Sequence, residues 1–181
     1  MTGCIFISMF NNAWISKQIA KAIGGWSSHS FVVRAKWDME QKHSTLETTD
    51  YQVANRIFEQ EYLLPECKFR GYEILNRSHL EKLEAMQDTD YLIDERYGYL
   101  RMLGYLIKLG LKLKNNPVRD GVWCTTVPLV YLKNLDFEWA KHINDENVDT
   151  KILESLLLSH PESFRLKYHK PYGTTEMETY E

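Results

Sequence analysis

Two segments that lie far apart in the chain carry residue types that could together perform nucleophilic catalysis. His29 stands at the start of a β-type run, WSSHSFVV (26–33), and Cys124 stands just before an apolar helical run, WCTTVPLV (123–130). A thiol attacks as its thiolate, which a neighbouring base generates and a helix N-terminus stabilises. The pair therefore predicts a Cys124 nucleophile with His29 as its base, acting on a carbonyl group.

A third polar group should hold the imidazole in its useful tautomer and stabilise its cation. We assign this role to Glu47, because it lies in the strand candidate 44–48, which is expected beside the strand of His29. His43 and Glu40 are the alternatives, since both belong to the same hairpin.

These residues also have structural interpretations. A lone Cys on an apolar helix is often a small core residue, and Cys4 and Cys67 are assigned that role. His29 could equally be a hydrogen-bonded residue at a strand edge.

Three aromatic residues near these segments, Trp26, Tyr51 and Trp123, could line an apolar pocket for an acyl or aromatic group. Such side chains more often fill a core or its rim, and that reading is favoured here.

The elements that must position these residues follow from hydrophobic periodicity. The run 4–10 predicts a buried strand, and the apolar spacing over 15–23 predicts a helix that Gly24 ends. Strands over 31–33 and 44–48 would then be joined by a connection over 36–42, whereas 51–62 fits either a helix or a surface loop.

The middle of the chain predicts one strand and two helices. A strand over 68–75 is followed by a Ser78–Glu81 capping box that starts a helix with Leu80, Leu83 and Met86 inward. A core helix is expected over 97–109, ending at Gly110, with its inward residues at helical spacing: Tyr99, Leu100, Leu103, Leu106 and Ile107.

The lysines that follow this helix, Lys108, Lys112 and Lys114, are most simply a solvated helix terminus. A phosphate or lipid-headgroup site is the alternative.

The C-terminal part predicts a last helix and a tail. Asp149 can cap a helix that ends at His160-Pro161. Residues 1–169 are expected to form one domain, and the polar stretch 170–181 is expected to be a mobile tail unless a partner orders it.

Composition excludes several classes of protein. The chain has 181 residues, 44% of them hydrophobic, and a net charge of −3, which gives no broad cationic surface for nucleic acid. Three cysteines without paired spacing argue against a disulfide framework or a zinc site, and no glycine-rich phosphate loop occurs. No segment reads as a signal peptide or a membrane span, so a cytoplasmic protein is expected.

Three blocks of the chain resemble the circularly permuted papain-like proteins of the NlpC/P60 superfamily, which include YiiX-like and lecithin retinol acyltransferase-like members. The first block comprises GCIFIS (3–8), ISKQI (15–19) and WSSHSFVV (26–33), similar to the family's Gly-Asp strand, helix and Ser-His strand. The second is TLET (45–48), and the third is WCTTV (123–127), with 149–164 similar to the helix that often follows. Together they sample most of the first 165 residues.

The sequence departs from the family pattern at two positions. Cys4 stands where Asp is common, which affects support of the strand. Thr126 stands where many members have Glu, which affects substrate contacts or helix capping. Neither change removes the nucleophile.

The resemblance implies an α+β, permuted papain-like fold in which a small antiparallel sheet packs against helices and the nucleophile lies at a helix N-terminus. It implies a cofactor-independent cysteine hydrolase that forms an acyl-thioester on Cys124 and cleaves a peptide, isopeptide or murein-type amide. A lipid-acyl hydrolase or acyltransferase is the second expectation, and a noncatalytic partner-binding protein on the same fold is the third. The oligomeric state is left open.

Overall fold

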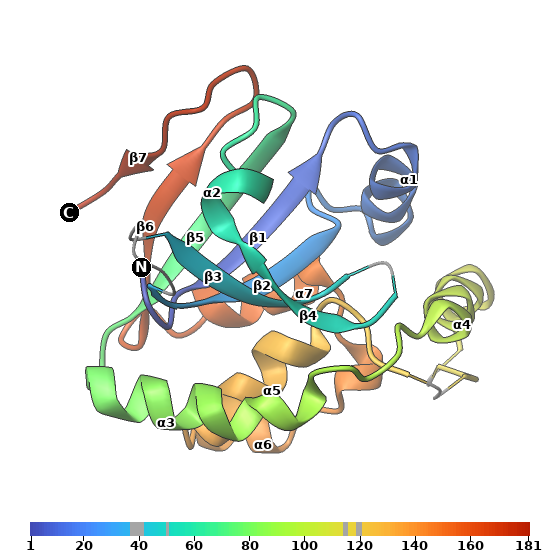
Figure 1. Ribbon diagram of the computed structural model, residues 1–181. Coiled ribbons are helices and arrows are strands. Elements are labelled where there is room, and N and C mark those ends of the chain that lie inside the picture. The colour runs from blue at the N-terminus through green and yellow to red at the C-terminus, as the bar shows by residue number, and fades with distance from the viewer. Residues whose placement is uncertain (37–41, 50, 114–115, 119–120) are drawn as a thin grey trace.

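The computed structural model describes residues 1–36, 42–49, 51–113, 116–118 and 121–181 (Figure 1). They form a mixed α+β structure around one seven-stranded antiparallel sheet with the strand order β4-β3-β2-β1-β5-β6-β7. The α+β class is therefore confirmed, although the sheet is larger than the small one predicted.

The strands and helices have the following bounds. The strands are β1 (Ile5–Phe10), β2 (His29–Lys36), β3 (His43–Thr48), β4 (Val53–Ile57), β5 (Cys67–Ile74), β6 (Phe164–Lys170) and β7 (Glu178–Thr179). The α-helices are α1 (Trp14–Ile23), α2 (Phe58–Glu61), α3 (His79–Thr89), α4 (Tyr99–Leu111), α5 (Thr126–Asn134), α6 (Glu138–Lys141) and α7 (Thr150–Leu158).

The central strand β1 is buried on both faces, so it reads as a nearly continuous apolar run. Ile5 and Ile7 point into a core shared with α3, α5 and α7, which Figure 1 shows along one side of the sheet. Phe6 points to the opposite face, into an aromatic cluster that α2 helps to cover. A Cβ on Gly71 of β5 would lie 2.6 Å from the Phe6 ring, so this cluster requires glycine there.

The predicted helix signals are confirmed at three points. The Ser78 hydroxyl accepts from the Glu81 N–H, and the Glu81 carboxylate accepts from the Ser78 N–H, completing the capping box of α3. Asp149 caps α7 by accepting from the Ile152 N–H at 2.8 Å. Gly24 ends α1 in the left-handed conformation, with a φ of 63°.

The predicted orientation of α4 is wrong. Its buried residues are Arg101, Gly104 and Tyr105, whereas Leu100 and Leu103 are exposed. The helix also continues through Gly110 and ends at Lys112, which adopts the left-handed conformation. The periodicity correctly indicated an apolar stripe on this helix. The stripe faces outward because the opposite side of α4 forms polar contacts with the segment before α7. Leu80 of α3, also predicted to face inward, is likewise exposed.

The ambiguous stretch 51–62 contains β4 and then α2. Two strands near the C-terminus have no counterpart in the sequence-based prediction. β6 pairs with β5, and β7, within the predicted tail 170–181, pairs with the outer edge of β6. The predicted connection 36–42 lies mostly outside the described residues, and Lys114 lies wholly outside them.

Candidate active site

The structure brings together Cys124, His29 and Glu47 from three different elements. His29 is the first residue of β2, and its strand partner on β1 is Ser8. Glu47 lies on β3 opposite Phe31, so its side chain is on the same face of the sheet as that of His29. The His29 Nε2 lies 2.9 Å from the Glu47 Oε2.

The Glu47 carboxylate is buried and fully engaged. Besides His29, it accepts hydrogen bonds from the Thr45 hydroxyl at 2.6 Å and the Tyr62 hydroxyl at 2.5 Å. Burial alone would raise the pKa of Glu47, but the hydrogen bond and charge of His29, supported by the two hydroxyls, hold it below its usual value. The carboxylate is therefore ionised at neutral pH and can stabilise an imidazolium.

Cys124 lies in the turn that immediately precedes α5, and neighbouring strands fix that turn. The Ser30 hydroxyl of β2 donates to the Cys124 carbonyl at 3.0 Å, and the Thr48 hydroxyl of β3 donates to the Trp123 carbonyl at 3.1 Å. The thiol faces the Ser28 carbonyl at 3.6 Å. β2 and β3 thus hold both the nucleophile candidate and the two residues expected to activate it.

Thr126, the position at which the sequence departs from the family pattern, closes the turn before α5. Its hydroxyl accepts from the Trp123 N–H at 3.2 Å, while its own N–H donates to the Trp123 carbonyl at 2.9 Å. This reciprocal pair satisfies the helix start, so Thr126 takes a capping role here. Cys4, the other position at which the sequence differs from the NlpC/P60-like pattern, is buried within the aromatic cluster.

The side chains of His29 and Cys124 interact directly. Burial by itself lowers the pKa of His29, but hydrogen bonds to Cys124 and Glu47 outweigh it and raise the pKa to about 10. Because Nε2 faces Glu47, Nδ1 is the ring nitrogen left for the sulfur. The raised pKa keeps the His29 ring protonated at neutral pH, so an imidazolium lies beside the sulfur.

Two polar groups beside the sulfur are not engaged within the described part of the chain. The Cys124 N–H donates to no acceptor there. The Ser28 hydroxyl is buried, also lacks a partner there, and borders the same cleft. Hydrogen-bond donors next to a nucleophile can stabilise the oxyanion that forms when a carbonyl is attacked.

The three residues open onto a cleft of about 320 Å³. Its apolar lining, here called the apolar wall, comes from β1, α1 and α4, and its polar lining, here called the polar wall, comes from β3, β4 and α2. The apolar wall contains Phe10, Ile15, Ile19, Tyr99 and Met102, and the polar wall contains Thr48, Arg56 and Glu61. The cleft can therefore receive a substrate that has both apolar and polar groups.

The three predicted pocket aromatics have different locations. Trp123 is buried against Tyr105 and lines a small hollow of about 30 Å³ that reaches Cys124. Trp26 lines another pocket, away from the cleft. Its indole N–H donates to the Glu154 carboxylate at 2.6 Å, and the Arg70 guanidinium lies over its ring. Tyr51 is exposed beyond the end of β3 and does not border the cleft.

The alternatives for the third residue lie elsewhere. His43 stands at the other end of β3, where its Nδ1 pairs with the Glu59 carboxylate at 2.8 Å. Glu40 lies outside the described residues. Among the proposed orienting residues, Glu47 is the one that contacts the His29 ring.

Tyr62 and Ser28 belong to the site but were not identified from the sequence. Tyr62 stacks on Phe31 and reaches Glu47, yet it ends a stretch with no clear periodicity. Ser28 precedes His29, and that adjacency was the available signal.

Other kinds of site receive less support. Among the residues that the structure describes, no group of three or more His, Cys, Asp or Glu could hold a metal ion. Over the same ranges, no helix is both long and apolar enough to cross a membrane. No protein-family model and no curated protein sequence matches the chain.

Proposed function

We propose that this protein is a cysteine-dependent hydrolase in which Cys124 forms an acyl-thioester and His29 moves the protons. The observation that carries the proposal is the chain of contacts from the Cys124 thiol through the His29 ring to the Glu47 carboxylate, open to a cleft. Nucleophile, base and orienting group in this order support acyl-transfer chemistry. The permuted papain-like resemblance of the sequence supports the same assignment.

In the first half of the reaction, His29 Nδ1 holds the proton taken from the sulfur, and the thiolate attacks the substrate carbonyl carbon. The Cys124 N–H and the Ser28 hydroxyl, which have no partner within the described residues, can donate to the oxygen that gains negative charge. When the tetrahedral intermediate collapses, the imidazolium donates its proton to the leaving amine or alcohol. The acyl group then remains on Cys124 as a thioester.

In the second half, a water molecule gives a proton to His29 and attacks the thioester carbonyl. Collapse of this intermediate releases the carboxylic acid and returns the proton to the sulfur. Glu47 stays ionised throughout and stabilises the imidazolium each time it forms. Neither half requires a cofactor.

An amide of the peptide, isopeptide or murein type is the first substrate class, because the cleft has a polar wall with Arg56 and Glu61 that suits a peptide backbone. A lipid-acyl ester, cleaved or transferred to another acceptor, is the second. The apolar wall that α1 and α4 provide favours this alternative.

A thiol-directed activity probe tests the proposal. An iodoacetamide probe should label Cys124 ahead of Cys4 and Cys67, and Cys124→Ala should abolish both this labelling and any turnover of amide or acyl-ester libraries. Cys4→Ala is the matched control and should retain both. Labelling of Cys124 no faster than that of Cys67, with no turnover, would favour a noncatalytic binding protein on this fold.

A further inference from the structure

Helix α4 packs against the protein through its polar side. Its inner face consists of Arg101, Gly104, Tyr105 and Lys108. The partners are Asp145 for Arg101 at 2.7 Å, Asp149 for Tyr105 at 2.7 Å and Asn147 for Lys108 at 2.6 Å. A Cβ on Gly104 would lie 2.4 Å from the Asn116 side chain, so the loop before α5 packs tightly on this face. These contacts fix which side of the helix faces outward.

The outward side of α4 is apolar. Leu100, Leu103, Ile107 and Leu111 recur three or four residues apart and therefore form one stripe along the helix. Each is between 42% and 68% exposed. Ordinary surface helices place such a stripe against the core, so a continuous exposed stripe indicates an interaction surface.

Helix α1 extends this apolar surface. α1 contacts α4, and both lie at the same edge of the molecule (Figure 1). On α1, Trp14 and Ile15 are exposed, and on α4 so is Tyr99. We refer to the seven residues as the apolar rim: Trp14, Ile15, Tyr99, Leu100, Leu103, Ile107 and Leu111. Ile15 and Tyr99 also line the cleft, so the rim borders its mouth.

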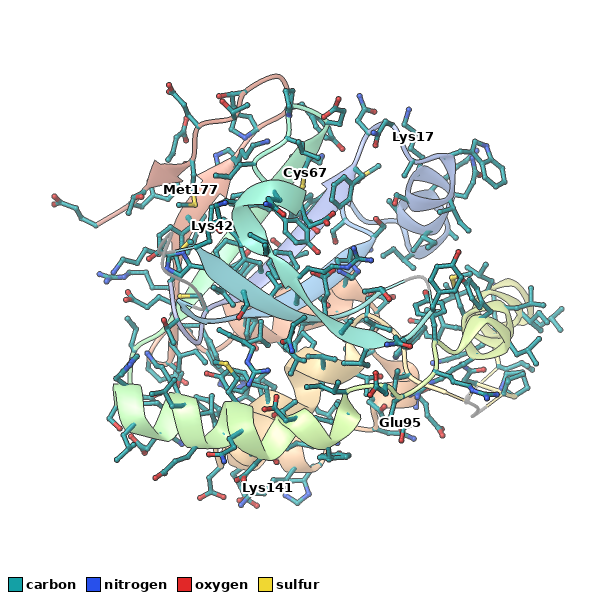
Figure 2. All side chains as sticks on the ribbon, in the orientation of Figure 1. Lys17, Lys42, Cys67, Glu95, Lys141 and Met177 are labelled. Atoms are coloured by element: carbon teal, nitrogen blue, oxygen red, sulfur yellow. The ribbon has the colours of Figure 1, made fainter. Side chains whose placement is uncertain are left out.

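The charged residues of the two helices themselves are all cationic. Neither 14–23 nor 99–113 contains Asp or Glu, whereas Lys17, Lys21 and Lys112 are exposed there. Figure 2 shows Lys17 on the outer side of α1. Since the whole chain carries a net charge of −3, this concentration of cationic groups beside an apolar surface is local.

We infer that the apolar rim docks onto an anionic lipid bilayer, with α4 lying in the plane of the interface and the cleft opening toward the membrane. A helix with an apolar face flanked by lysines binds such an interface by burying the face among acyl chains and pairing lysines with headgroups. With 13 residues, α4 extends about 20 Å, shorter than a hydrocarbon core of about 30 Å, so it lies on a membrane and does not span it.

Charge favours a lipid surface over a second copy of this chain. A twofold interface built on the rim would join two surfaces that both carry Lys17, Lys21 and Lys112, and this like charge costs free energy. Anionic headgroups instead complement all of them.

Membrane docking goes beyond the proposed hydrolase, since it requires none of the catalytic residues. If both are right, acyl chains of the bilayer lie at the apolar wall of the cleft, and the lipid-acyl substrate class becomes the favoured one. That last step rests on the proposed function.

Vesicle sedimentation tests the docking. The full chain should bind large unilamellar vesicles of phosphatidylglycerol and phosphatidylcholine, and bind pure phosphatidylcholine vesicles much more weakly. The triple variant Leu100→Ser, Leu103→Ser, Ile107→Ser should lower the partition coefficient by about tenfold or more. Lys17→Gln and Lys21→Gln should each lower it by about fivefold at low salt.

A matched control removes exposed leucines from other helices. Leu80 of α3 and Leu158 of α7 are as exposed as the rim leucines, so Leu80→Ser, Leu158→Ser should bind vesicles like the wild type. Circular dichroism of all variants establishes that they remain folded.

Three results would overturn the inference: no binding to anionic vesicles, equal binding to neutral ones, or equal losses in the rim and control variants. Concentration-dependent self-association that only the rim variant abolishes, without vesicle binding, would assign the surface to a second copy. Cys124→Ala should bind vesicles normally. Failure of Cys124 labelling with intact vesicle binding would therefore reject the hydrolase alone.

Discussion

Cys124 and Cys67 lie in two opposite kinds of surroundings within one sheet-based fold. Cys67 begins β5 inside the aromatic cluster, fully buried beside Phe69, and Figure 2 shows it within the molecule near α2. Burial raises its pKa to about 12. Cys124 instead borders the open cleft, and its sulfur faces the His29 ring.

The contrast shows that surroundings, and not residue type, determine which thiol can react. Cys4 resembles Cys67, since burial raises its pKa to about 11. Neither thiol has an imidazole beside it, whereas Cys124 has the His29 ring beside it and borders the cleft. The chain thus carries two internal references for the reactivity of the third cysteine.

The largest effect on this contrast is expected from His29→Ala. Removing the imidazole takes away the proton acceptor of Cys124, so its alkylation by iodoacetamide at pH 6 should slow by about 10²-fold. Peptide mapping by mass spectrometry gives the rate at each cysteine. The rates at Cys4 and Cys67 should not change, and equal slowing at all three would point to altered folding instead.

The pH dependence of turnover should show the second largest effect. Because the pKa of His29 is raised to about 10, the ring stays cationic from pH 6 to about pH 9 and can protonate the leaving group throughout. Turnover should fall as pH rises through about 10, when the ring loses the proton that the leaving group needs.

Two results would contradict this expectation. One is wild-type turnover that already falls between pH 6 and pH 8, as expected for a ring with its ordinary pKa near 6.5. The other is an identical profile in His29→Ala, which lacks the ring.

The contrast between the two cysteines was partly readable from the sequence. A His at the start of a strand and a Cys before a helix were visible as local patterns, and Glu47 followed from expected strand pairing. Tyr62 was not, because its contact with Glu47 depends on how α2 folds over the sheet. Local patterns predict elements, whereas such contacts depend on tertiary packing.

Helix α4 illustrates a different limit. Its spacing correctly indicated a helix with an apolar stripe, but periodicity is the same whether that stripe meets the protein core or another apolar phase. The ion pair of Arg101 with Asp145 decides the orientation, and it joins segments 44 residues apart. The strands β6 and β7 were missed for a related reason, because mixed polar sequences pair there at the edge of an existing sheet.

Glu47→Gln should have a smaller effect than His29→Ala or than titration of the His29 ring. The amide keeps the shape of the side chain but cannot stabilise an imidazolium, so the pKa of His29 should fall from about 10 toward 6.5. Each unit of this fall corresponds to about a tenfold loss in stabilisation of the cation, so Cys124 alkylation should slow by about tenfold to a hundredfold. Titration of the His29 ring by NMR gives the shift directly.

Glu59→Gln is the matched control for this change. Glu59 pairs with His43 at the far end of β3, so its amide variant should leave the His29 titration and the Cys124 rate unchanged. A wild-type His29 titration in Glu47→Gln would show that the carboxylate does not set the charge state of the His29 ring.

Tyr62→Phe should have the smallest effect, because Tyr62 acts on the sulfur only through Glu47. Its hydroxyl is one of the donors that hold the pKa of Glu47 below its usual value, so losing it should let that pKa rise. The acid limb of turnover should then move to higher pH, and the rate at pH 7 should fall only about threefold, near 0.7 kcal/mol.

Tyr131→Phe is the control, since the Tyr131 hydroxyl is buried but donates to the Gly3 carbonyl, away from the cleft. Both variants should lose about 1 kcal/mol of unfolding free energy. Only Tyr62→Phe should shift the acid limb, and an equal shift in both would reduce Tyr62 to a packing residue.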